Sequence, residues 1–404
     1  MIIELHIIQN FAPSNLNRDD SNAPKDCEFG GYRRARISSQ CIKRSVRRHD
    51  AFKKAVQSAK GDLGVRTKRM IGKLAEMFVE QHGKSQAEAI AVAERAVTLF
   101  GVKRDDKHRE KTSILLYLGE NELGDLAEIV VANWGIMSTM KIVAPVEEEG
   151  EGETQKKGKK AKVPALTKEQ QTIQKELQKI VGDERLKEGS YAADIALFGR
   201  MVADKSLKNM NVDAACQVAH AISTHKVEMK MDYFTAVDDL LPGEDSGSDM
   251  IGVVDFNSSC FYRYSAINLN KLRKNLGTTN ADLLSATVKG YLEASVKAVP
   301  TGMQNSTAPQ NPAGYVRVLV RKDGFPWSLT NAFQKPVHVK RDESESLEES
   351  SIKALEGYFE RLKNVYGGES IVCDASFNIY NENTCSLTKL LEIVDDILTK
   401  GTTV

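Results

Sequence analysis

The residues with the clearest capacity for chemistry are the basic ones between Gly30 and His49. This stretch contains no Asp or Glu, although the formal net charge of the whole chain is only +1. On a helix, Lys43 lies over Arg47 and Arg44 over Arg48, and like charges at this spacing repel one another unless an anion neutralises them. The pattern therefore predicts a polyanion-binding surface. Its cations are Arg33, Arg34, Arg36, Lys43, Arg44, Arg47 and Arg48.

A short helix must position these cations. Ser38–Ser39 can cap a helix over Gln40–His49, on which Ile42 and Val46 form an apolar stripe facing the core. Free N–H groups at such a helix start suit a phosphate, and Gly30–Gly31 allows a close approach of backbone to a ligand. A solvated basic helix, or pairing with acids elsewhere in the chain, is the alternative interpretation.

An acidic pair precedes this stretch. Asp19 and Asp20 could hold a metal ion, with Arg18 and Lys25 on phosphates, or they could belong to a polar loop with internal Asx turns. The seven histidines are scattered, and none of the six cysteines forms a C-x-x-C pair. We therefore expect no catalytic residue, no metal site and no cofactor.

Composition and apolar patterning indicate where in the cell the protein is expected. Its 41% hydrophobic and 27% charged residues are typical of a globular protein. No apolar run approaches the roughly 20 residues of a membrane span, and the first ten residues lack a basic region typical of a signal peptide. We expect a cytoplasmic protein with reduced thiols and no membrane partner.

The wider pattern indicates a mixed α+β fold. Ile3, Leu5 and Ile7 alternate with polar residues and predict an opening strand. Residues 51–190 are mainly helical, with an acidic-then-basic tract at 147–163 that we expect to be a mobile loop. Alternation over Lys226–Val237 and a possible returning strand at Ile251–Phe256 predict a β-hairpin with a loose tip. Further strands are expected at Phe261–Leu269, Tyr315–Arg321 and Ser370–Asp374, and helices at Ala281–Val299, Ser351–Tyr366 and Leu387–Lys400.

Several of these motifs together resemble the CasC family, the backbone subunits of type I-E CRISPR surveillance complexes (Cascade). The resemblance runs in order along nearly the whole chain, except for the helical middle. It is carried by Asn17–Asp20, Lys25–Asp26, Phe29–Gly31, Arg33–Gln40, Lys43–Arg44, Asp194–Met201, Ala219–His225, Asp232–Leu240, Phe261–Tyr264, Asn311–Ala313 and Asn331–Phe333.

The resemblance implies a hand-like fold. A modified RRM-like (ferredoxin-like) palm would comprise residues 1–50, 191–222 and 260–404. Helical fingers would comprise 51–190, including the tract at 147–163, and a long β-hairpin thumb 223–259.

The resemblance also implies a function in antiviral defence. Such subunits stack head to tail along a guide RNA (crRNA) as a helical filament, kink it with the thumb and present its bases to target DNA. Implied partners are crRNA, target DNA, further copies, and the large, small, cap and guide-processing subunits. The RNA-binding residues that we expect from the motif and the basic stretch are Arg18, Lys25, Arg34, Arg36, Ser38, Gln40, Lys43, Arg44, Arg47 and Met201.

Two other functions remain open from the residues alone. A metal-dependent ribonuclease would need a catalytic Asp in the early loop, where Asp19, Asp20 and Asp26 are available. A general single-stranded RNA-binding protein would need aromatic stacking platforms beside the cations. None lies between Arg33 and Arg48, so we favour guide binding without catalysis.

Overall fold

The computed structural model describes residues 1–140, 166–182, 191–202, 207, 210–236, 250–277, 281–339 and 344–400. The expected loop at 147–163 and the expected hairpin tip at 237–249 lie outside these residues. The chain forms two compact units. The sheet unit comprises Met1–Lys60, Ala215–Leu272 and Asn280–Val404, and the helical unit comprises Gly61–Ala214 and Arg273–Thr279. The division into palm, fingers and thumb stays a prediction.

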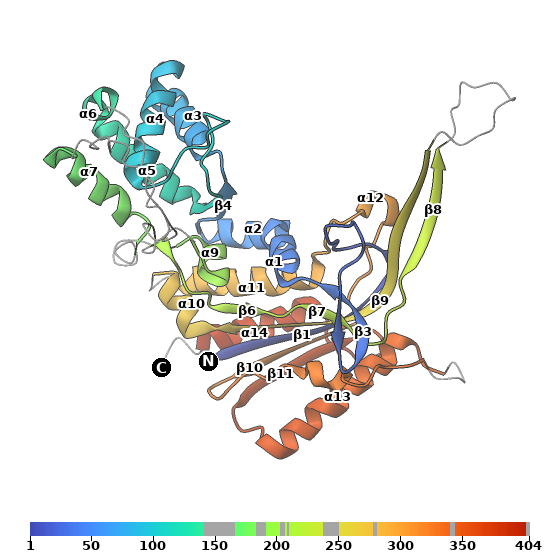
Figure 1. Cartoon of the computed structure of the whole chain (residues 1–404). Coiled ribbons are helices and arrows are strands. Elements are labelled where there is room, and N and C mark those ends of the chain that lie inside the picture. Colours follow the sequence, from blue (N-terminus) through green and yellow to red (C-terminus); the bar gives the residue numbers. More distant parts are fainter. Residues whose placement is uncertain are drawn as a thin grey trace, which may run out of the picture. The chain divides into compact units, whose positions relative to one another are not determined.

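An antiparallel sheet is the centre of the sheet unit (Figure 1), and together with the helices it confirms the α+β class. The strand order is β11-β10-β1-β9-β7-β3-β2, and β6 and β8 also pair with β9. Because β9 and β10 both pair antiparallel with β1, they are parallel to each other, with β1 between them. The strands are β1 (Ile2–Ser14), β2 (Asp26–Phe29), β3 (Tyr32–Ile37), β6 (Cys216–Val218), β7 (Ala221–Ser223), β8 (Lys230–Ala236), β9 (Met250–Asn268), β10 (Tyr315–Arg321) and β11 (Ile371–Asn378).

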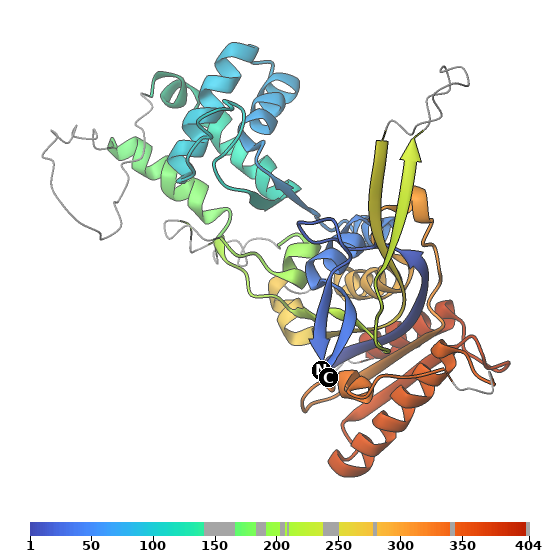
Figure 2. The same ribbon diagram turned by 45° about the vertical axis from the view of Figure 1, so that its right-hand side comes forward.

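Strand β9 joins two structures. The pattern indicated separate strands at Ile251–Phe256 and Phe261–Leu269, whereas β9 is continuous over 19 residues. Its first part pairs with β8 as the expected hairpin, and its second part pairs with β1. Continuity is possible because each half has its own partner for backbone hydrogen bonds. In both views the β8–β9 hairpin extends beyond the end of the sheet (Figure 2).

Helices cover both faces of the sheet. On one face, Tyr291 of α11 and Ile42 of α1 lie near Leu5 and Ile7 of β1. On the other face, α13 and η2 bury a cluster that includes Ile8. The helices of this unit are α1 (Ser39–Arg48), α2 (Asp50–Ser58), α11 (Ala281–Lys297), α12 (Gln304–Thr307), η2 (Leu329–Phe333), α13 (Leu347–Tyr366) and α14 (Leu387–Lys400), which has the predicted bounds.

Because both faces are covered, the polar residues of β1 are buried as well. Glu4 and His6 are fully inaccessible, and each has a partner on the α13 side. Glu4 forms an ion pair with Arg321, and His6 Nδ1 lies 2.8 Å from the Tyr262 hydroxyl. The alternating residues of β1 thus face two buried sides, and the α13 side combines these polar pairs with the apolar cluster around Ile8.

The helical unit has its own apolar core, to which α3, α4, α5 and α7 contribute. No helix in the described part of the chain is both long and apolar enough to cross a membrane. Helix α10 (Leu269–Asn275) runs from the sheet unit into this one. The other elements are β4 (Gly64–Thr67), α3 (Met70–His82), α4 (Gln86–Phe100), β5 (Leu116–Gly119), α5 (Glu120–Ala132), α6 (Trp134–Thr139), α7 (Lys168–Lys179) and α9 (Ala193–Phe198).

Candidate nucleic-acid interface

Helix α1 begins where the sequence predicts. Ser38 is the N-cap, with extended backbone angles, and its Oγ accepts a hydrogen bond from Cys41 N at 3.3 Å. Ile42 and Val46 are the buried residues of the helix. The apolar stripe fixes which side of α1 packs inward, so the cations must occupy the remaining sides.

The cations of α1 lie at or near the surface. Arg44 and Arg48 are exposed, whereas Lys43 and Arg47 are half-buried. The first turn contains no acid, and Arg47 and Arg48 occupy the last turn, where they complement the helix dipole. Gln40, in the first turn, is exposed. The helix therefore presents hydrogen-bond donors and positive charge without an acidic residue of its own.

The three arginines of β3 have different environments. Arg33 is exposed and pairs with Asp26. Arg36 is half-buried, and its Nε donates to the Asp26 carbonyl at 3.0 Å. Arg34 is 0% exposed, and its guanidinium donates to four backbone carbonyls, those of Ser223, Thr224, Phe333 and Gln334. Arg34 thus offers no exposed atom to a phosphate, which differs from the expectation that it contacts RNA.

The Gly30–Gly31 turn between β2 and β3 also serves the fold. Both glycines have positive φ, 64° and 79°, as a two-residue hairpin turn of this type requires. A Cβ on Gly30 would lie 2.1 Å from the Gln334 carbonyl oxygen. The sequence suggested that a ligand approaches the backbone at Gly30. In the structure, the group that approaches it is the Gln334 carbonyl of the same chain.

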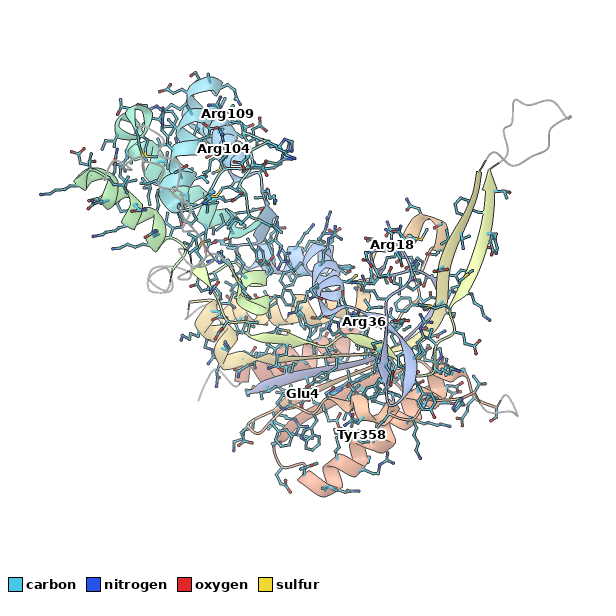
Figure 3. All side chains as sticks on the ribbon, in the orientation of Figure 1. Glu4, Arg18, Arg36, Arg104, Arg109 and Tyr358 are labelled. Atoms are coloured by element: carbon cyan, nitrogen blue, oxygen red, sulfur yellow. The ribbon has the colours of Figure 1, made fainter. Side chains whose placement is uncertain are left out.

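A hollow of about 410 Å³ lies between the early loop and β3. Figure 3 shows Arg18 and Arg36 on the opposite side of Glu4 from Tyr358 of α13. Arg18 is exposed and Lys25 half-buried, and Lys25 N donates to the Asn17 carbonyl at 2.8 Å. The lining residues are Arg18, Asp19, Asp20, Lys25, Asp26 and Arg36.

The acids of this hollow have local partners. Asp19 Oδ1 accepts hydrogen bonds from Ser21 N, Ser21 Oγ and Ala23 N at 2.7 to 3.0 Å, as in the Asx turn that the sequence allowed. The hydrogen bond from the Ser21 hydroxyl is the main reason that the pKa of Asp19 is lowered. Asp26 is paired with Arg33. Among the described residues, no three His, Cys, Asp or Glu side chains form a group suited to a metal ion.

His220 is a member of this site that sequence reasoning missed. Its Nδ1 accepts a hydrogen bond from Ser39 N at 3.0 Å, and the residue is exposed. Burial of part of the ring, then Arg36 and then Lys25, lower the pKa of His220. Its 181-residue separation from Ser39 hides this contact in the sequence; the available signal was its place in the Ala219–His225 motif.

Met201 belongs to the helical unit and is 90% exposed. The preceding Arg200 is buried, and its Nη1 donates to Glu122 Oε2 at 2.7 Å. At Gly199, where φ is 77°, a Cβ would lie 2.6 Å from the Val212 carbonyl oxygen. The anchored Gly199–Arg200 pair therefore holds the following Met outside the core.

The β8–β9 hairpin has an exposed apolar side. Tyr233 of β8 lies opposite Val253 of β9, and Met231 is two residues from Tyr233, so the three share a face. All three are exposed, Tyr233 by 70%. Exposed large apolar side chains that share one face are typical of a contact surface.

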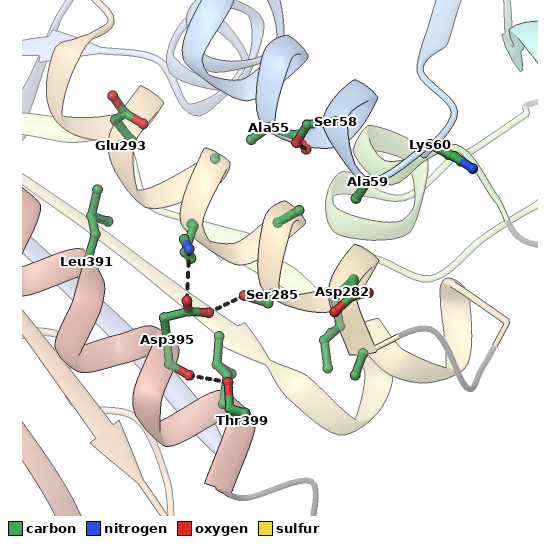
Figure 4. A pocket seen from close by; sticks show the side chains of 16 residues that line it. Ala55, Ser58, Ala59, Lys60, Asp282, Ser285, Glu293, Leu391, Asp395 and Thr399 are labelled. Atoms are coloured by element: carbon green, nitrogen blue, oxygen red, sulfur yellow. Dashed lines mark hydrogen bonds and ion pairs between the residues drawn. The ribbon is translucent and has the colours of Figure 1, made fainter.

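A larger hollow, about 730 Å³, lies between α2, α11 and α14 of the sheet unit (Figure 4). Its lining contains both signs of charge: Lys60 and Lys289 face Asp282, Glu293 and Asp395. Lys289 Nζ and Asp395 Oδ2 pair at 2.8 Å. Because its lining contains three acids and two bases, this hollow lacks the excess positive charge of α1.

Comparisons with known proteins agree over nearly the whole chain. Residues 3–395 match the family described as CT1975-like protein. One similar solved structure is a chain of a "CRISPR RNA-guided surveillance complex, pre-nicking", with 27% identity and a TM-score of 0.75 over 99% of this chain and 100% of that one. Another belongs to a "CRISPR RNA-guided surveillance complex", with 25% identity and a TM-score of 0.65 over the same shares. No curated protein matches the chain.

Proposed function

The chain belongs to the CT1975-like protein family, and from this premise we propose that it is a CasC-type backbone subunit of a type I-E CRISPR surveillance complex. In this role it binds guide RNA and does not cut it. The family match, the similarity to chains of RNA-guided surveillance complexes and the basic surface around α1 support the proposal.

The acid-free helix α1 carries the proposal. Arg18, Lys25 and Arg36 add cations from a hollow whose Asp19 and Asp26 already have partners within the chain. Cations suit phosphates and carry no sequence information. A protein that must hold guides of any sequence needs this kind of contact, because the base edges have to stay free for pairing. We therefore place the guide backbone along Arg18, Lys25, Arg36, Ser38, Gln40, Lys43, Arg44 and Arg47, and leave out Arg34.

We assign the parts of the molecule to the roles that the family resemblance implies. In this proposal the sheet is a modified RRM-like palm, the helical unit the fingers, and the β8–β9 hairpin the thumb. The apolar side with Met231, Tyr233 and Val253 contacts a neighbouring copy or an unstacked base, and exposed Met201 packs against a displaced base. Copies stack head to tail, as a heterologous interface that does not close into a ring allows.

Triple substitution of Lys43, Arg44 and Arg47 by Ala tests the RNA-binding surface. We expect RNA to be lost from the purified protein while the melting temperature stays unchanged, because these side chains lie outside the core. The matched control is the triple Ala variant of Lys353, Arg361 and Lys363, which are exposed cations of α13. The proposal fails if the α1 variant retains as much RNA as this control.

The absence of catalysis needs its own assay. RNA hydrolysis with metal ions usually requires carboxylates that converge on two ions about 4 Å apart. Incubating the protein, alone and assembled on a guide, with labelled RNA and Mg²⁺ or Mn²⁺ should leave the RNA intact. Cleavage that disappears in Asp19→Ala, Asp20→Ala or Asp26→Ala would favour the ribonuclease. Equal affinity for short random RNA and for a guide with repeat-derived ends would favour a general RNA-binding protein.

A further inference from the structure

The pairing of β3 with β7 determines the position of His220. Arg36 lies opposite Ile222 and Ile37 opposite Ala221, so the next step of the ladder brings His220 beside the residues that start α1. The contact made there is the hydrogen bond from Ser39 N to His220 Nδ1, at 3.0 Å. The register between β3 and β7 thus positions the imidazole against the start of α1.

This contact changes how the start of α1 can bind an anion. The N–H of Ser38 donates to Asn17 Oδ1 at 2.8 Å, that of Ser39 to His220, and that of Cys41 to Ser38 Oγ. Three of the N–H groups expected to bind a phosphate are therefore engaged within the chain. A phosphate at this position therefore gains from a donor on a side chain.

His220 has such a donor. Because Nδ1 accepts a hydrogen bond, it carries no proton, and the proton of the neutral ring must be on Nε2. Nε2 lies across the ring from Nδ1, and the residue is exposed. The lowered pKa of His220, which follows from partial burial and from Arg36 and Lys25, favours the neutral ring, and the hydrogen bond from Ser39 N sets the tautomer. Both cations belong to the hollow that also contains Arg18.

We propose that His220 is a guide-binding residue: its Nε2–H donates to an RNA phosphate that Arg36 and Lys25 neutralise, while its Nδ1 holds the start of α1. This inference rests on the proposed RNA-binding function. The ring acts as a neutral donor, so it positions a phosphate and adds no charge. The same ring contacts both α1 and the phosphate, so it fixes the position of the phosphate relative to the start of α1.

Three substitutions separate the two edges of the ring. In His220→Asn the short amide oxygen can still accept from Ser39 N, but the variant lacks the outer donor. In His220→Gln the longer amide can supply the outer donor, and in His220→Ala both are lost. Arg36→Gln is the charge control. The measurements are the Kd of the full chain for labelled single-stranded RNA, its dependence on salt, and the melting temperature.

We expect His220→Asn to bind RNA about tenfold more weakly, since a hydrogen bond to a charged phosphate is lost. Its melting temperature should equal that of the wild type, and His220→Gln should recover affinity. The slope of log K against log salt should not change in His220→Asn, whereas Arg36→Gln should reduce its magnitude by about 0.7, the value for one phosphate of a single strand.

Wild-type affinity in His220→Asn would overturn the inference. The inference would also fail if all three variants lost the same affinity and had the same lowered melting temperature. His220 would then only cap α1. If the wild-type chain itself does not bind RNA, the failure belongs to the proposed function, and the two failures are distinguished within one titration series.

Discussion

The basic surface around α1 and the charged residues beneath α13 use the same residue types in opposite settings. Around α1, Arg44 and Arg48 are exposed, and the stretch from Gly30 to His49 contains no acid. Beneath α13, Arg321 is 1% exposed and forms an ion pair with Glu4. A buried cation with its counterion in the chain serves folding. Exposed cations such as Arg44 and Arg48, on a stretch that contains no acid, favour an anion from outside.

The buried Glu4 carboxylate receives its hydrogen bonds from donors within the chain. Glu4 Oε2 accepts hydrogen bonds from Trp327 N at 2.6 Å and from the Tyr264 hydroxyl at 3.2 Å. The guanidinium of Arg321 lies 3.8 Å from the centre of the Trp327 ring. Burial raises the pKa of Glu4, and the ion pair with Arg321 opposes this rise. The Glu4 carboxylate therefore depends on Arg321 for its charged state.

Removing the buried carboxylate should have the largest effect on stability. Glu4→Gln leaves the Arg321 guanidinium without a counterion in the interior, and breaking such a pair costs about 3–5 kcal/mol of unfolding free energy. Urea denaturation measures the change. The double variant Glu4→Leu/Arg321→Met should recover most of it, because an apolar pair needs no counterion. A loss below about 1 kcal/mol in Glu4→Gln would show that Arg321 is not dependent on Glu4.

Arg33 and Arg34 show the same contrast in two adjacent residues, since Arg33 is exposed and Arg34 is buried. Arg34→Met removes the guanidinium donors of the buried Thr224 and Phe333 carbonyls, and of these two only Thr224 keeps another donor, Val337 N. The expected cost is about 1–3 kcal/mol. Arg33→Met removes only a surface ion pair with Asp26, worth about 0–1 kcal/mol. Urea denaturation of both variants, together with their RNA affinity, checks this. If Arg34→Met folds with wild-type stability and loses RNA, Arg34 belongs with the exposed cations after all.

This pair also marks the limit of prediction from sequence. Helix α1, its Ser38 cap and its buried Ile42 and Val46 follow from local spacing, and so do most strands and helices. Arg33 and Arg34 cannot be separated in that way, because the carbonyls that bury Arg34 are supplied by residues 223–224 and 333–334. For the same reason the sequence does not reveal that the polar face of β1 is interior.

His6 gives a pH-dependent test of the polar interior. Burial, with Arg317 and Arg321 nearby, lowers the pKa of His6 from 6.5 to about 3. Below pH 6.5 the unfolded chain therefore binds a proton that the folded chain does not. The unfolding free energy should fall by up to about 1.4 kcal/mol per pH unit as the pH decreases from 6.5 towards 3, and this group should contribute no slope above pH 7.

Urea denaturation at pH 6.5, 5.5 and 5.0 measures this dependence before most carboxylates titrate. The slope should decrease in His6→Leu, which cannot bind a proton at this position. His338→Leu, at an exposed histidine, controls for the replacement of an imidazole by leucine at the surface. An equal slope in wild type and His6→Leu would mean that His6 is not held neutral in the folded state.

The salt dependence of RNA binding tests the central contrast most directly. Fluorescence anisotropy with labelled single-stranded RNA would give log K against log salt for the wild type, the α1 variant (Lys43, Arg44 and Arg47 to Ala) and the α13 control (Lys353, Arg361 and Lys363 to Ala). Each phosphate contact contributes about 0.7 to the slope, so the α1 variant should lose about 2 from its magnitude, and the α13 control nothing. Equal slopes in the two variants would contradict an RNA-binding surface around α1.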